Sequence, residues 1–377
     1  MKFTQKRIFY LIAFIFGFSA GLFSQDTKKI KLLFVGDIMM HQAQLDAAKI
    51  SGTEDYDFTS TFRLVKPLIE DADMAFGNLE LTLPGKPPYK GWPNFRSPDA
   101  LATALYNTGF DVLTTANNHS NDGRKLGVEH TIECLKNVGF HQTGTFKDTT
   151  NRLVDYPLLI YKNGFRMAIL NYTYGTDKKP NYPPTYVNKI DERLIKKDIL
   201  KAKQLNPDVV IVMMHWGKEY KMIQHKSQEK LANQMFDWGA NIIVGSHPHV
   251  VQPIVTSGIG KTKKVVAYSL GNFVSDQKKP NTEGGILLEI ELTKTKNQKP
   301  EITDLSYTTV YRSKTENNGK ELFEIIPVHF YLQDSNLLSK LNPKIREKMT
   351  YFAEKIRKHL GATSNCRERK FYNKNSK

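Results

Sequence analysis

The sequence predicts an α/β fold in which helices cover both faces of a β-sheet. From Lys29 to Leu292, short apolar runs alternate with segments of helical periodicity. Apolar runs that lack alternating polar residues are typical of strands buried on both faces. The composition, 40% hydrophobic and 24% charged, is that of a globular chain, and no repeat of fixed period indicates a solenoid or propeller.

Strands are expected where short apolar runs end at Gly, Asn or His residues. Between two of these runs, Asn163-Gly164 predicts a hairpin, because this dipeptide favours a two-residue turn. The expected strands are, in chain order, Ile30–Val35, Met74–Phe76, Asp111–Thr115, Tyr156–Tyr161, Arg166–Tyr172, Asp208–Met214, Asn241–Val244, Val265–Leu270 and Ile286–Leu292.

Helices are expected between these strands, where apolar residues recur at intervals of three and four. Leu101, Ala104 and Leu105 share one face of such a segment, and Gly139 follows another as a helix stop. The segment Thr176–Asn188 is rich in Lys, Pro and Tyr and predicts a loop. The expected helices are Phe62–Asp71, Pro98–Thr108, Gly127–Val138, Asp191–Gln204 and Ser227–Trp238.

The chain changes character after Leu292, so we expect a main domain over residues 30–292 and a β/helix extension over residues 293–360. The extension contains two β-like segments, Glu301–Arg312 and Phe323–Leu332. Asn342-Pro343 then opens a helix, since Pro is favoured in the first helical turn. Residues 361–377 form a basic tail that we expect to be disordered.

The C-terminal helix has one apolar stripe and a strongly basic opposite face. Two explanations fit this pattern: the stripe docks onto the main domain, or the helix lies on an anionic membrane. The stripe comprises Leu341, Ile345, Met349, Phe352, Ile356 and Leu360.

The N-terminus predicts an exported protein, periplasmic or associated with the cell envelope. Lys2, Lys6 and Arg7 precede the uncharged run Ile8–Phe23, which is the pattern of a secretory signal peptide over residues 1–24. The run is slightly short for a membrane span, and an uncleaved anchor is the alternative. The chain has only two cysteines, Cys134 and Cys366, which we expect to be free thiols; a single disulfide is the alternative.

The net charge of +16 is concentrated near the C-terminus, where residues 341–377 carry eleven Lys or Arg against three Glu. For an exported protein, this charge favours an anionic envelope polymer or a membrane surface over nucleic acid. A solvated basic tail without a partner explains it equally well. No Walker-type phosphate loop occurs, which argues against a nucleotide-driven motor or a kinase. The segment Ser269-Leu-Gly-Asn272-Phe273 lacks the Gly-x-Ser-x-Gly frame of a nucleophile elbow.

Polar side chains follow five of the expected strands at the point where each strand ends. In α/β folds, the carboxyl ends of strands meet at one edge, where active sites form. A single Asp, Asn or His at such a place is usually a turn, capping or packing residue, but turn chemistry does not explain four histidines. The set comprises Asp37, Asn78, Glu80, Asn118, His119, His215, His247 and His249.

This mixture of carboxylate, amide and imidazole groups fits a pair of divalent cations, with Mn, Fe or Zn as candidates. Gly-Ser-His247-Pro-His249 is the most specific element, because two imidazoles on a tight turn can each face one of two adjacent metals. A carboxylate such as Glu80 can bridge both ions, and the Asn118 oxygen can complete one shell. Two metals roughly 3.5–4 Å apart can promote phosphoryl or acyl displacement.

Six motifs occur in a fixed order, and together they resemble the CapA-type, poly-γ-glutamate capsule biosynthesis branch of the calcineurin-like metallophosphoesterase superfamily. The resemblance covers residues 30–290 and implies an α+β four-layer sandwich. The motifs are Gly36-Asp37, Asn78-Leu-Glu80, Ala116-Asn-Asn118-His119-Ser-Asn-Asp122, His215-Trp-Gly-Lys-Glu219-Tyr220, Gly245-Ser-His247-Pro-His249 and Ser269-Leu-Gly-Asn272-Phe273.

The resemblance also implies roles for these residues. His119 matches the position that protonates the leaving group, and Asp122 either orients His119 or caps the following helix. The first metal would be held by Asp37, Glu80 and His249, with Asn78 as a further ligand, and the second by Glu80, Asn118, His215 and His247.

Two departures from the superfamily pattern stand beside these matches. Met39 occupies the position of the His in the usual Asp-x-His opening, and His41 comes two positions later. The usual Gly-Asp of the second motif is replaced by Asn78-Leu-Glu80.

Other residues near the motifs have two explanations each. Glu219, Tyr220 and Arg96 are candidates for binding substrate, and ordinary surface or loop packing is the alternative for each. We expect Trp216 to pack in the core and Asn272 to be structural.

The sequence and the resemblance together predict an exported, dinuclear metal-dependent hydrolase of phosphoesterase type. Its substrate would be a phosphoester or an anionic envelope polymer such as a γ-glutamyl polymer, and no nucleic-acid partner is expected. The competing prediction is a non-catalytic, membrane-associated factor for assembly or export of a capsule polymer.

Overall fold

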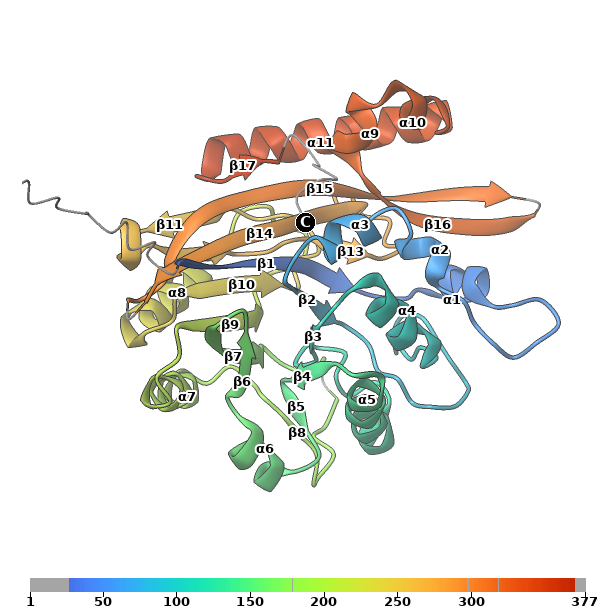
Figure 1. Ribbon diagram of the computed structural model, residues 1–377. Coiled ribbons are helices and arrows are strands. Elements are labelled where there is room, and N and C mark those ends of the chain that lie inside the picture. Colours follow the sequence, from blue (N-terminus) through green and yellow to red (C-terminus); the bar gives the residue numbers. More distant parts are fainter. Residues whose placement is uncertain (1–26, 178, 297, 318, 370–377) are drawn as a thin grey trace, which may run out of the picture.

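Two β-sheets pack face to face with helices on their outer faces (Figure 1). The computed structural model describes residues 27–177, 179–296, 298–317 and 319–369. The four layers run from helices through two sheets to helices again, so the α/β four-layer sandwich that the resemblance implied is confirmed. The expectation of helices on both faces of one sheet is wrong, because each sheet packs one face against the other sheet. The expected signal peptide over residues 1–24 lies outside the described residues.

The first sheet combines parallel strands from the N-terminal half with antiparallel strands from the C-terminal half. Its β1–β4 strands are parallel, and β14–β16 add to β1 as an antiparallel meander. In spatial order the strands are β16 (Lys320–Pro327), β15 (Glu301–Asn317), β14 (Gly284–Thr295), β1 (Thr27–Ile38), β2 (Met74–Leu79), β3 (Val112–Thr114) and β4 (His141–Thr143), with β13 (Asn272–Val274) beside β1 and β17 (Arg367–Glu368) beside β15.

The second sheet contains the predicted hairpin at one edge. Asn163 and Gly164 both have positive φ angles, 50° and 80°, as a two-residue hairpin turn requires. The spatial order is β11 (Ile254–Ser257), β12 (Lys264–Ala267), β10 (Ile242–Ser246), β9 (Val209–His215), β7 (Phe165–Thr173) and β6 (Leu158–Lys162). A separate two-stranded sheet joins β5 (Thr145–Phe146) to β8 (Tyr186–Val187).

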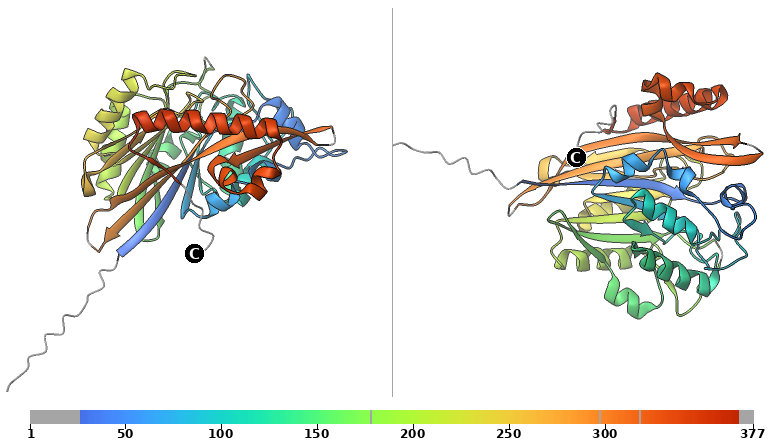
Figure 2. Two further views of the ribbon diagram at one scale, coloured as in Figure 1. Left: turned by 90° about the horizontal axis from the view of Figure 1, so that it is seen from above. Right: turned by 45° about the vertical axis from the view of Figure 1, so that its right-hand side comes forward.

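Helices connect the strands and cover the outer faces (Figure 2). On the first sheet lie α1 (Gln42–Ala48), α2 (Thr59–Phe62), α3 (Lys66–Glu70), α4 (Ala100–Thr108) and α5 (Arg124–Val138). On the second lie α7 (Glu192–Gln204) and α8 (Lys226–Trp238), with α6 (Thr149–Asp155) against β5 and a 3-10 turn at Gly260–Thr262. The C-terminal helices are α9 (Val328–Gln333), α10 (Ser335–Ser339) and α11 (Pro343–Thr363).

Two expected elements differ from the structure. The single helix expected over Phe62–Asp71 is instead the pair α2 and α3, and Pro67 lies in the first turn of α3, where Pro starts a helix. The β segment expected over Phe323–Leu332 ends at Pro327, and α9 follows. Pro327 has no N–H to donate to a sheet ladder, so the strand stops there.

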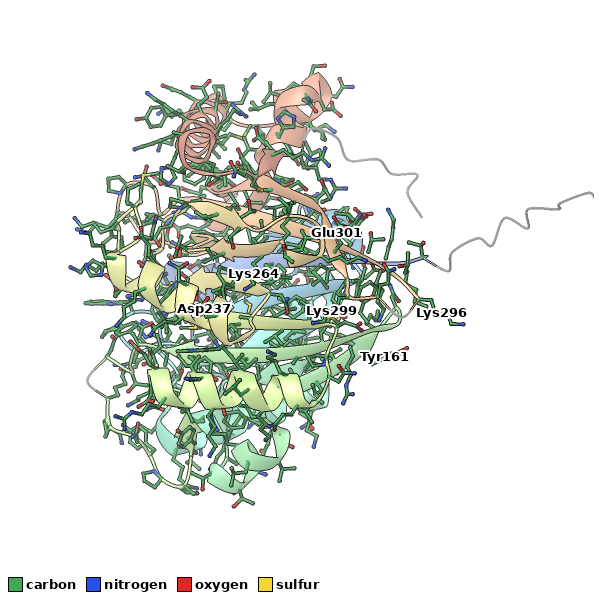
Figure 3. The ribbon with its side chains drawn as sticks, turned by 90° about the vertical axis from the view of Figure 1, so that its left-hand side faces the viewer. Tyr161, Asp237, Lys264, Lys296, Lys299 and Glu301 are labelled. Carbon is green, nitrogen blue, oxygen red and sulfur yellow. The ribbon has the colours of Figure 1, made fainter. Side chains whose placement is uncertain are left out.

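Alternation along the strands assigns each side chain to one of the layers. Phe34 of β1 and Phe76 of β2 point between the sheets and stack with ring centroids 4.7 Å apart. Ile169 and Ile211 meet them from the second sheet, and such side chains fill the space between the sheets (Figure 3). Leu33, one residue from Phe34, faces the helices on the other side.

The apolar stripe of α11 docks onto the first sheet, as one of the two explanations predicted. Ile345, Met349, Phe352, Ile356 and Leu360 are buried and belong to the core that includes Tyr307 and Tyr311 of β15. The stripe is therefore not available to a membrane. In the described part of the chain, no helix combines the length and the apolar character that a membrane crossing needs. The domain boundary expected at Leu292 falls within β14.

The expectation of disorder from residue 361 onward is wrong for residues 361–369. α11 continues to Thr363, and β17 pairs with β15. Arg369 then reaches two nearly buried carboxylates, Glu289 at 2.6 Å and Asp71 at 2.9 Å. These ion pairs supply the order that composition could not reveal. Residues 370–377 lie outside the described residues, and Cys134 and Cys366 are free thiols.

Replacing Arg369 with Ala should lower the free energy of unfolding by about 3 kcal/mol, because the nearly buried Glu289 loses its cation and the nearly buried Asp71 keeps only Lys31. Urea unfolding at neutral pH measures this. Arg367→Ala is the matched control: Arg367 is 73% exposed and pairs with Asp304, so its loss should cost less than about 1 kcal/mol. Equal effects of the two variants would contradict an anchoring role for Arg369.

Candidate metal centre

The carboxyl ends of strands from both sheets meet at one place. In the first sheet, the register puts Asp37 of β1 beside Asn78 of β2 and beside Asn272 of β13. In the second, His215 at the end of β9 lies beside Ser246 at the end of β10. The two sheets approach each other here, since Asn78 Nδ2 lies 3.2 Å from His215 Nδ1.

Two motif glycines permit this close approach. A Cβ atom at Gly36 would lie 1.8 Å from the carbonyl oxygen of Gly271, and one at Gly245 would lie 1.9 Å from that of Tyr268. Neither position can hold a side chain without moving the neighbouring strand. Because these two positions are glycines, the loop that carries Asp37 can lie against the backbone of Gly271, and the loop that carries His247 can lie against that of Tyr268.

The turn after β10 holds two histidines in an unusual backbone conformation. His247 has φ of 95° and His249 has φ of 58°, a region that residues with a side chain seldom occupy. Such strain persists where the surrounding structure enforces it, and it is common at functional sites. The two rings lie 5.9 Å apart between centroids and are both buried.

Asp37 is held by three groups from different parts of the chain. Asn78 Nδ2 donates to Oδ1 at 2.8 Å, the His247 amide donates to Oδ2 at 3.2 Å, and His249 Nδ1 lies 3.0 Å from Oδ2. Burial alone would raise the pKa of Asp37, but the hydrogen bonds, first of all that of His249, hold it below its usual value. His249 Nδ1 also contacts Asn272 Oδ1 at 3.1 Å, which leaves Nε2 free.

Glu80 lies between the two halves of the site. Its Oε1 is 3.6 Å from His215 Nε2 and 3.9 Å from His249 Nε2. The side chain is fully buried, and neither carboxylate oxygen has a hydrogen-bond partner in the described part of the chain. Burial, then the neighbouring Asp37 carboxylate, raises the pKa of Glu80 well above its usual value. An orphaned buried carboxylate is costly unless a cation neutralises it.

His215, Asn118 and His247 form the other half. His215 Nε2 lies 2.6 Å from Asn118 Oδ1. His247 is 4% exposed, and its Nδ1 is buried without a partner among the described residues. Burial lowers the pKa of His215 well below its usual value and that of His247 to about 3, so both imidazoles are neutral, the form that binds metals.

These donors fit divalent cations. Asp37, Glu80 and His249 bring one ligand atom each within 4.8 Å of one another, and so do Glu80, His215 and His247. Glu80 belongs to both groups, which is where a bridging ligand would stand. Carboxylate oxygens and neutral imidazole nitrogens suit Mn, Fe or Zn.

The two departures from the superfamily pattern have structural consequences. Met39 is buried in the core between the first sheet and its helices, so this position delivers no ligand. His41 does not replace it: its Nδ1 accepts a hydrogen bond from the Asp276 amide, and its ring packs on Phe95 at 5.0 Å between centroids. Burial lowers the pKa of His41 to about 4.

His119 and Asp122 lie beside the donors as a hydrogen-bonded pair. His119 Nδ1 is 2.8 Å from Asp122 Oδ2, and both side chains are nearly buried. Of the two roles considered for Asp122, orienting His119 agrees with this geometry. Capping does not, because the residue at the N-terminus of α5 is Gly123, without a side-chain cap. Phe95 packs edge-on against the His119 ring at 4.7 Å.

The loop after β7 supplies residues that sequence reasoning missed. Asp177 accepts a hydrogen bond from Asn118 Nδ2 at 2.6 Å and one from the Tyr174 hydroxyl at 2.6 Å. The Tyr174 ring lies 4.4 Å from that of His247, and Lys179 forms an ion pair with Asp122. The signal was present: this Lys/Pro/Tyr-rich loop follows the end of a strand of the second sheet, the edge where His215 and His247 stand.

The expected substrate-binding residues lie at different distances from the donors. Tyr220 is 37% exposed, and its ring lies 6.1 Å from that of His249. Glu219 is exposed and brings a carboxylate oxygen within 4.8 Å of ligand atoms of His247 and His249. Arg96 follows Phe95 and pairs through its backbone with Lys90, and its Nε atom is buried without a hydrogen-bond partner among the described residues. Trp216 is buried, as expected, and its Nε1 donates to Tyr268.

Comparison with known sequences places these residues in a family. The model of the bacterial capsule synthesis protein family PGA_cap matches residues 31–277. The capsule biosynthesis protein CapA of Bacillus anthracis is 32% identical over 357 residues, which cover 86% of this chain and 81% of that protein. The PGA biosynthesis protein CapA of Bacillus subtilis (strain 168) is 30% identical over 325 residues, 81% of each chain.

Two solved structures show the extent of the similarity in fold. The NAD nucleotidase of Haemophilus influenzae has a TM-score of 0.49 at 12% identity, over 87% of this chain and 63% of that one. The calcineurin-like phosphoesterase YfkN of Bacillus subtilis has a TM-score of 0.43 at 14% identity, over 75% of this chain and 90% of that one.

Proposed function

Because this chain belongs to the bacterial capsule synthesis protein family PGA_cap, we propose that it is an exported hydrolase that depends on two divalent cations and acts on a capsule or other envelope polymer. The substrate bond is a phosphoester or a γ-glutamyl amide. Residues 1–24 would serve as the export signal.

One observation carries the proposal: the Glu80 carboxylate is fully buried without a hydrogen-bond partner, between His215 and His249. A structural carboxylate in such a place would be satisfied by donors. A carboxylate that bridges two cations would instead need both oxygens free. The imidazoles around Glu80 would provide the remaining ligands, with Asp37 on one side and Asn118 on the other.

Two cations bound at such a site activate water and offset negative charge that develops on the substrate oxygen. The chain's own residues would supply the proton for the leaving group. Asp122 accepts the hydrogen bond from His119 Nδ1, which fixes the orientation of the ring. His119 Nε2 can then donate a proton to the leaving oxygen or nitrogen. Lys179 forms an ion pair with Asp122 and so helps to hold that carboxylate in place.

A second candidate function is a non-catalytic factor in polymer assembly or export. Met39 favours it, because the position of the expected histidine ligand is occupied by a buried thioether. Such a factor would keep the fold and the cation without turnover.

Metal analysis and hydrolysis assays distinguish the two functions. Purified protein should contain close to two equivalents of Mn, Fe or Zn, and with added Mn²⁺ it should hydrolyse phenyl phosphate or shorten poly-γ-glutamate. The His119→Ala variant is the control for background hydrolysis. Bound metal with equal, negligible turnover in both proteins would favour the non-catalytic function, and wild-type protein that binds no metal would contradict both proposals.

A further inference from the structure

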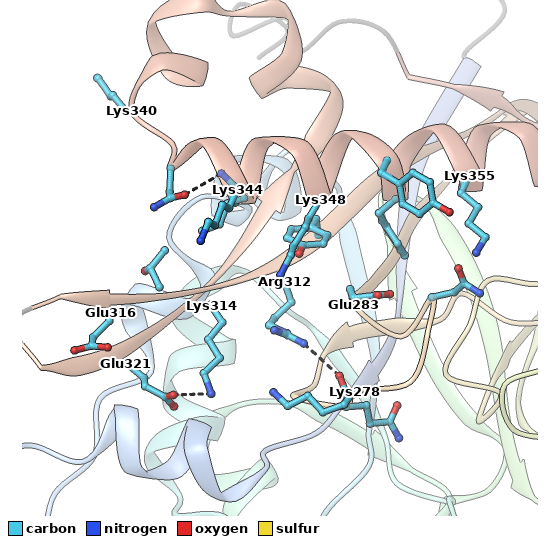
Figure 4. Close-up of a pocket in the computed structure, with 18 residues that line it drawn as sticks. Lys278, Glu283, Arg312, Lys314, Glu316, Glu321, Lys340, Lys344, Lys348 and Lys355 are labelled. Carbon is cyan, nitrogen blue, oxygen red and sulfur yellow. Dashed lines mark hydrogen bonds and ion pairs between the residues drawn. The ribbon is translucent and has the colours of Figure 1, made fainter.

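A deep basic groove lies between α11, the β15–β16 hairpin and the loop formed by residues 275–283 (Figure 4). Its volume is about 1120 Å³. Seven Lys or Arg side chains line it against three glutamates, so its charge is positive. The cations are Lys278, Arg312, Lys314, Lys340, Lys344, Lys348 and Lys355, and the acids are Glu283, Glu316 and Glu321.

The sequence of α11 separates its charges between faces. Lys344, Lys348, Tyr351 and Lys355 follow one another at intervals of four, three and four residues, which places them on one stripe. This stripe lines the groove, and Figure 4 shows its three lysines pointing from α11 toward β15 and the loop below. The acidic Glu347 and Glu354 of the helix line a different depression.

Part of the positive charge on the floor of the groove is neutralised within the protein. Lys314 pairs with Glu321 at 2.6 Å, and Lys278 with Asp276 at 2.6 Å. Arg312 lies 3.5 Å from the same Asp276 carboxylate. These cations hold the loop against β15 and are already satisfied.

The lysines on the wall are different. Within the described ranges, Lys340, Lys344, Lys348 and Lys355 form no ion pair. Lys355 only approaches the ring of Tyr351, at 5.9 Å, and that ring is itself 66% exposed. A concave surface concentrates the potential of unpaired charges and attracts an anionic ligand.

The groove is connected to the metal centre by two hydrogen-bond contacts. Gln277, which lines the groove, accepts a hydrogen bond from Asn272 Nδ2 at 3.0 Å. Asn272 Oδ1 in turn lies 3.1 Å from His249 Nδ1. A chain bound in the groove would therefore lie close to the proposed catalytic residues.

The shape of the groove favours an extended chain over a flat lipid surface. Its lysines face β15 across a concave space, which a bilayer cannot enter (Figure 4). Lys344 and Lys355 are eleven residues apart on the helix, or about 16 Å. An extended polypeptide spans that length with about five residues.

We propose that this groove binds a linear polycarboxylate chain and holds it for the metal centre. The inference rests on the proposed function for the identity of the polymer, and on the groove alone for its location. The unpaired lysines Lys344, Lys348 and Lys355 provide the charge that recognises successive carboxylates.

A triple variant, K344E/K348E/K355E, tests the proposal in the full chain. Its affinity for fluorescently labelled poly-γ-glutamate, measured by anisotropy at low salt, should fall at least about tenfold. The matched control, K196E/K203E/K226E, changes the charge equally on α7 and α8, where all three side chains are exposed on the far side of the second sheet. It should bind within about twofold of wild type.

Further arms separate the sources of negative charge. Phosphatidylglycerol vesicles should bind more weakly than poly-γ-glutamate, and their binding should not depend on the three lysines. Equal polymer affinity of the triple variant and the control would overturn the proposal. If wild-type protein did not bind the polymer but bound vesicles, and the triple variant lost that vesicle binding, the proposal would be overturned and the groove would be a membrane-binding surface.

Failure of the groove and failure of the catalytic proposal give different results. Metal content and p-nitrophenyl phosphate hydrolysis should be unchanged in the triple variant, because none of its positions touches the donors. A protein without turnover that still binds polymer through these lysines would contradict only the hydrolase proposal.

Discussion

Replacing Glu80 with Gln should abolish metal-dependent hydrolysis, with a loss of at least about 100-fold in kcat/KM. Replacing a residue that only orients a metal ligand already lowers activity or metal affinity about 10- to 100-fold. Replacing a ligand that both cations share should therefore lower kcat/KM further. The amide keeps the shape of the side chain but cannot bridge two cations as a carboxylate does. Mass spectrometry of bound metal should show that the variant retains less than half of the wild-type content.

In the metal-free protein, the Glu80→Gln substitution should increase stability. Burial raises the pKa of Glu80, so the folded state binds a proton more tightly than the unfolded state does. By linkage, the contribution of Glu80 to the free energy of unfolding falls as pH rises above about 4.5. At pH 7, E80Q protein treated with chelator should be more stable than treated wild type, by at least about 1 kcal/mol. With saturating Mn²⁺ the order should reverse.

Glu54→Gln is the control, because the Glu54 side chain is 87% exposed and belongs to none of the groups of described residues that could hold a metal ion. It should leave metal content unchanged and shift stability in chelator by less than about 0.5 kcal/mol. If E80Q retained full metal content, or destabilised the metal-free protein as strongly as the loaded one, Glu80 would be a structural residue and the proposed centre would be wrong.

Replacing His119 with Ala should slow hydrolysis by about 10²- to 10⁴-fold for a substrate whose leaving group needs a proton. Phenyl phosphate is such a substrate, whereas the p-nitrophenolate of p-nitrophenyl phosphate leaves without full protonation. The variant should therefore lose much more activity toward the first than toward the second. Its metal content should match wild type, because His119 belongs to neither group of donors.

This split distinguishes a proton donor from a structural residue. A packing defect around the edge-on contact with Phe95 would reduce both activities together and would lower metal content. His141→Ala serves as the control, since His141 is exposed at the amino end of β4 and belongs to none of the donor groups. Equal losses toward both substrates would exclude His119 as the general acid.

Much of the fold could be predicted because it depends on local patterns. The apolar runs became β1, β2, β9 and β10, and the turn at Asn163-Gly164 formed the hairpin between β6 and β7. Predictions from the sequence were wrong where a contact between residues far apart in the chain outweighed the local composition. Residues 361–369 resemble a disordered basic tail, but Arg369 finds two buried carboxylates that are 80 and 298 residues away in sequence.

The candidate site shows the same division. The motifs identified the donors, since an Asp, Glu or His after an apolar strand is visible in sequence. They did not reveal Tyr174, Asp177 and Lys179, whose loop has no distinctive motif and contacts Asn118 and Asp122 only in the folded chain. Nor could they decide between the two roles of Asp122.

The sequence by itself determined the order of strands and helices and the types of donor side chain, because these follow from the order and periodicity of residues. Its ordered motifs indicated the family and, through that resemblance, the four layers. The tertiary structure alone decided that the Glu80 carboxylate is orphaned between two imidazoles and that four lysines line a groove without acidic partners in the described part of the chain. Burial and pairing are properties of the surroundings of a side chain. Those surroundings come from strands and helices far apart in sequence, which only the folded chain brings together.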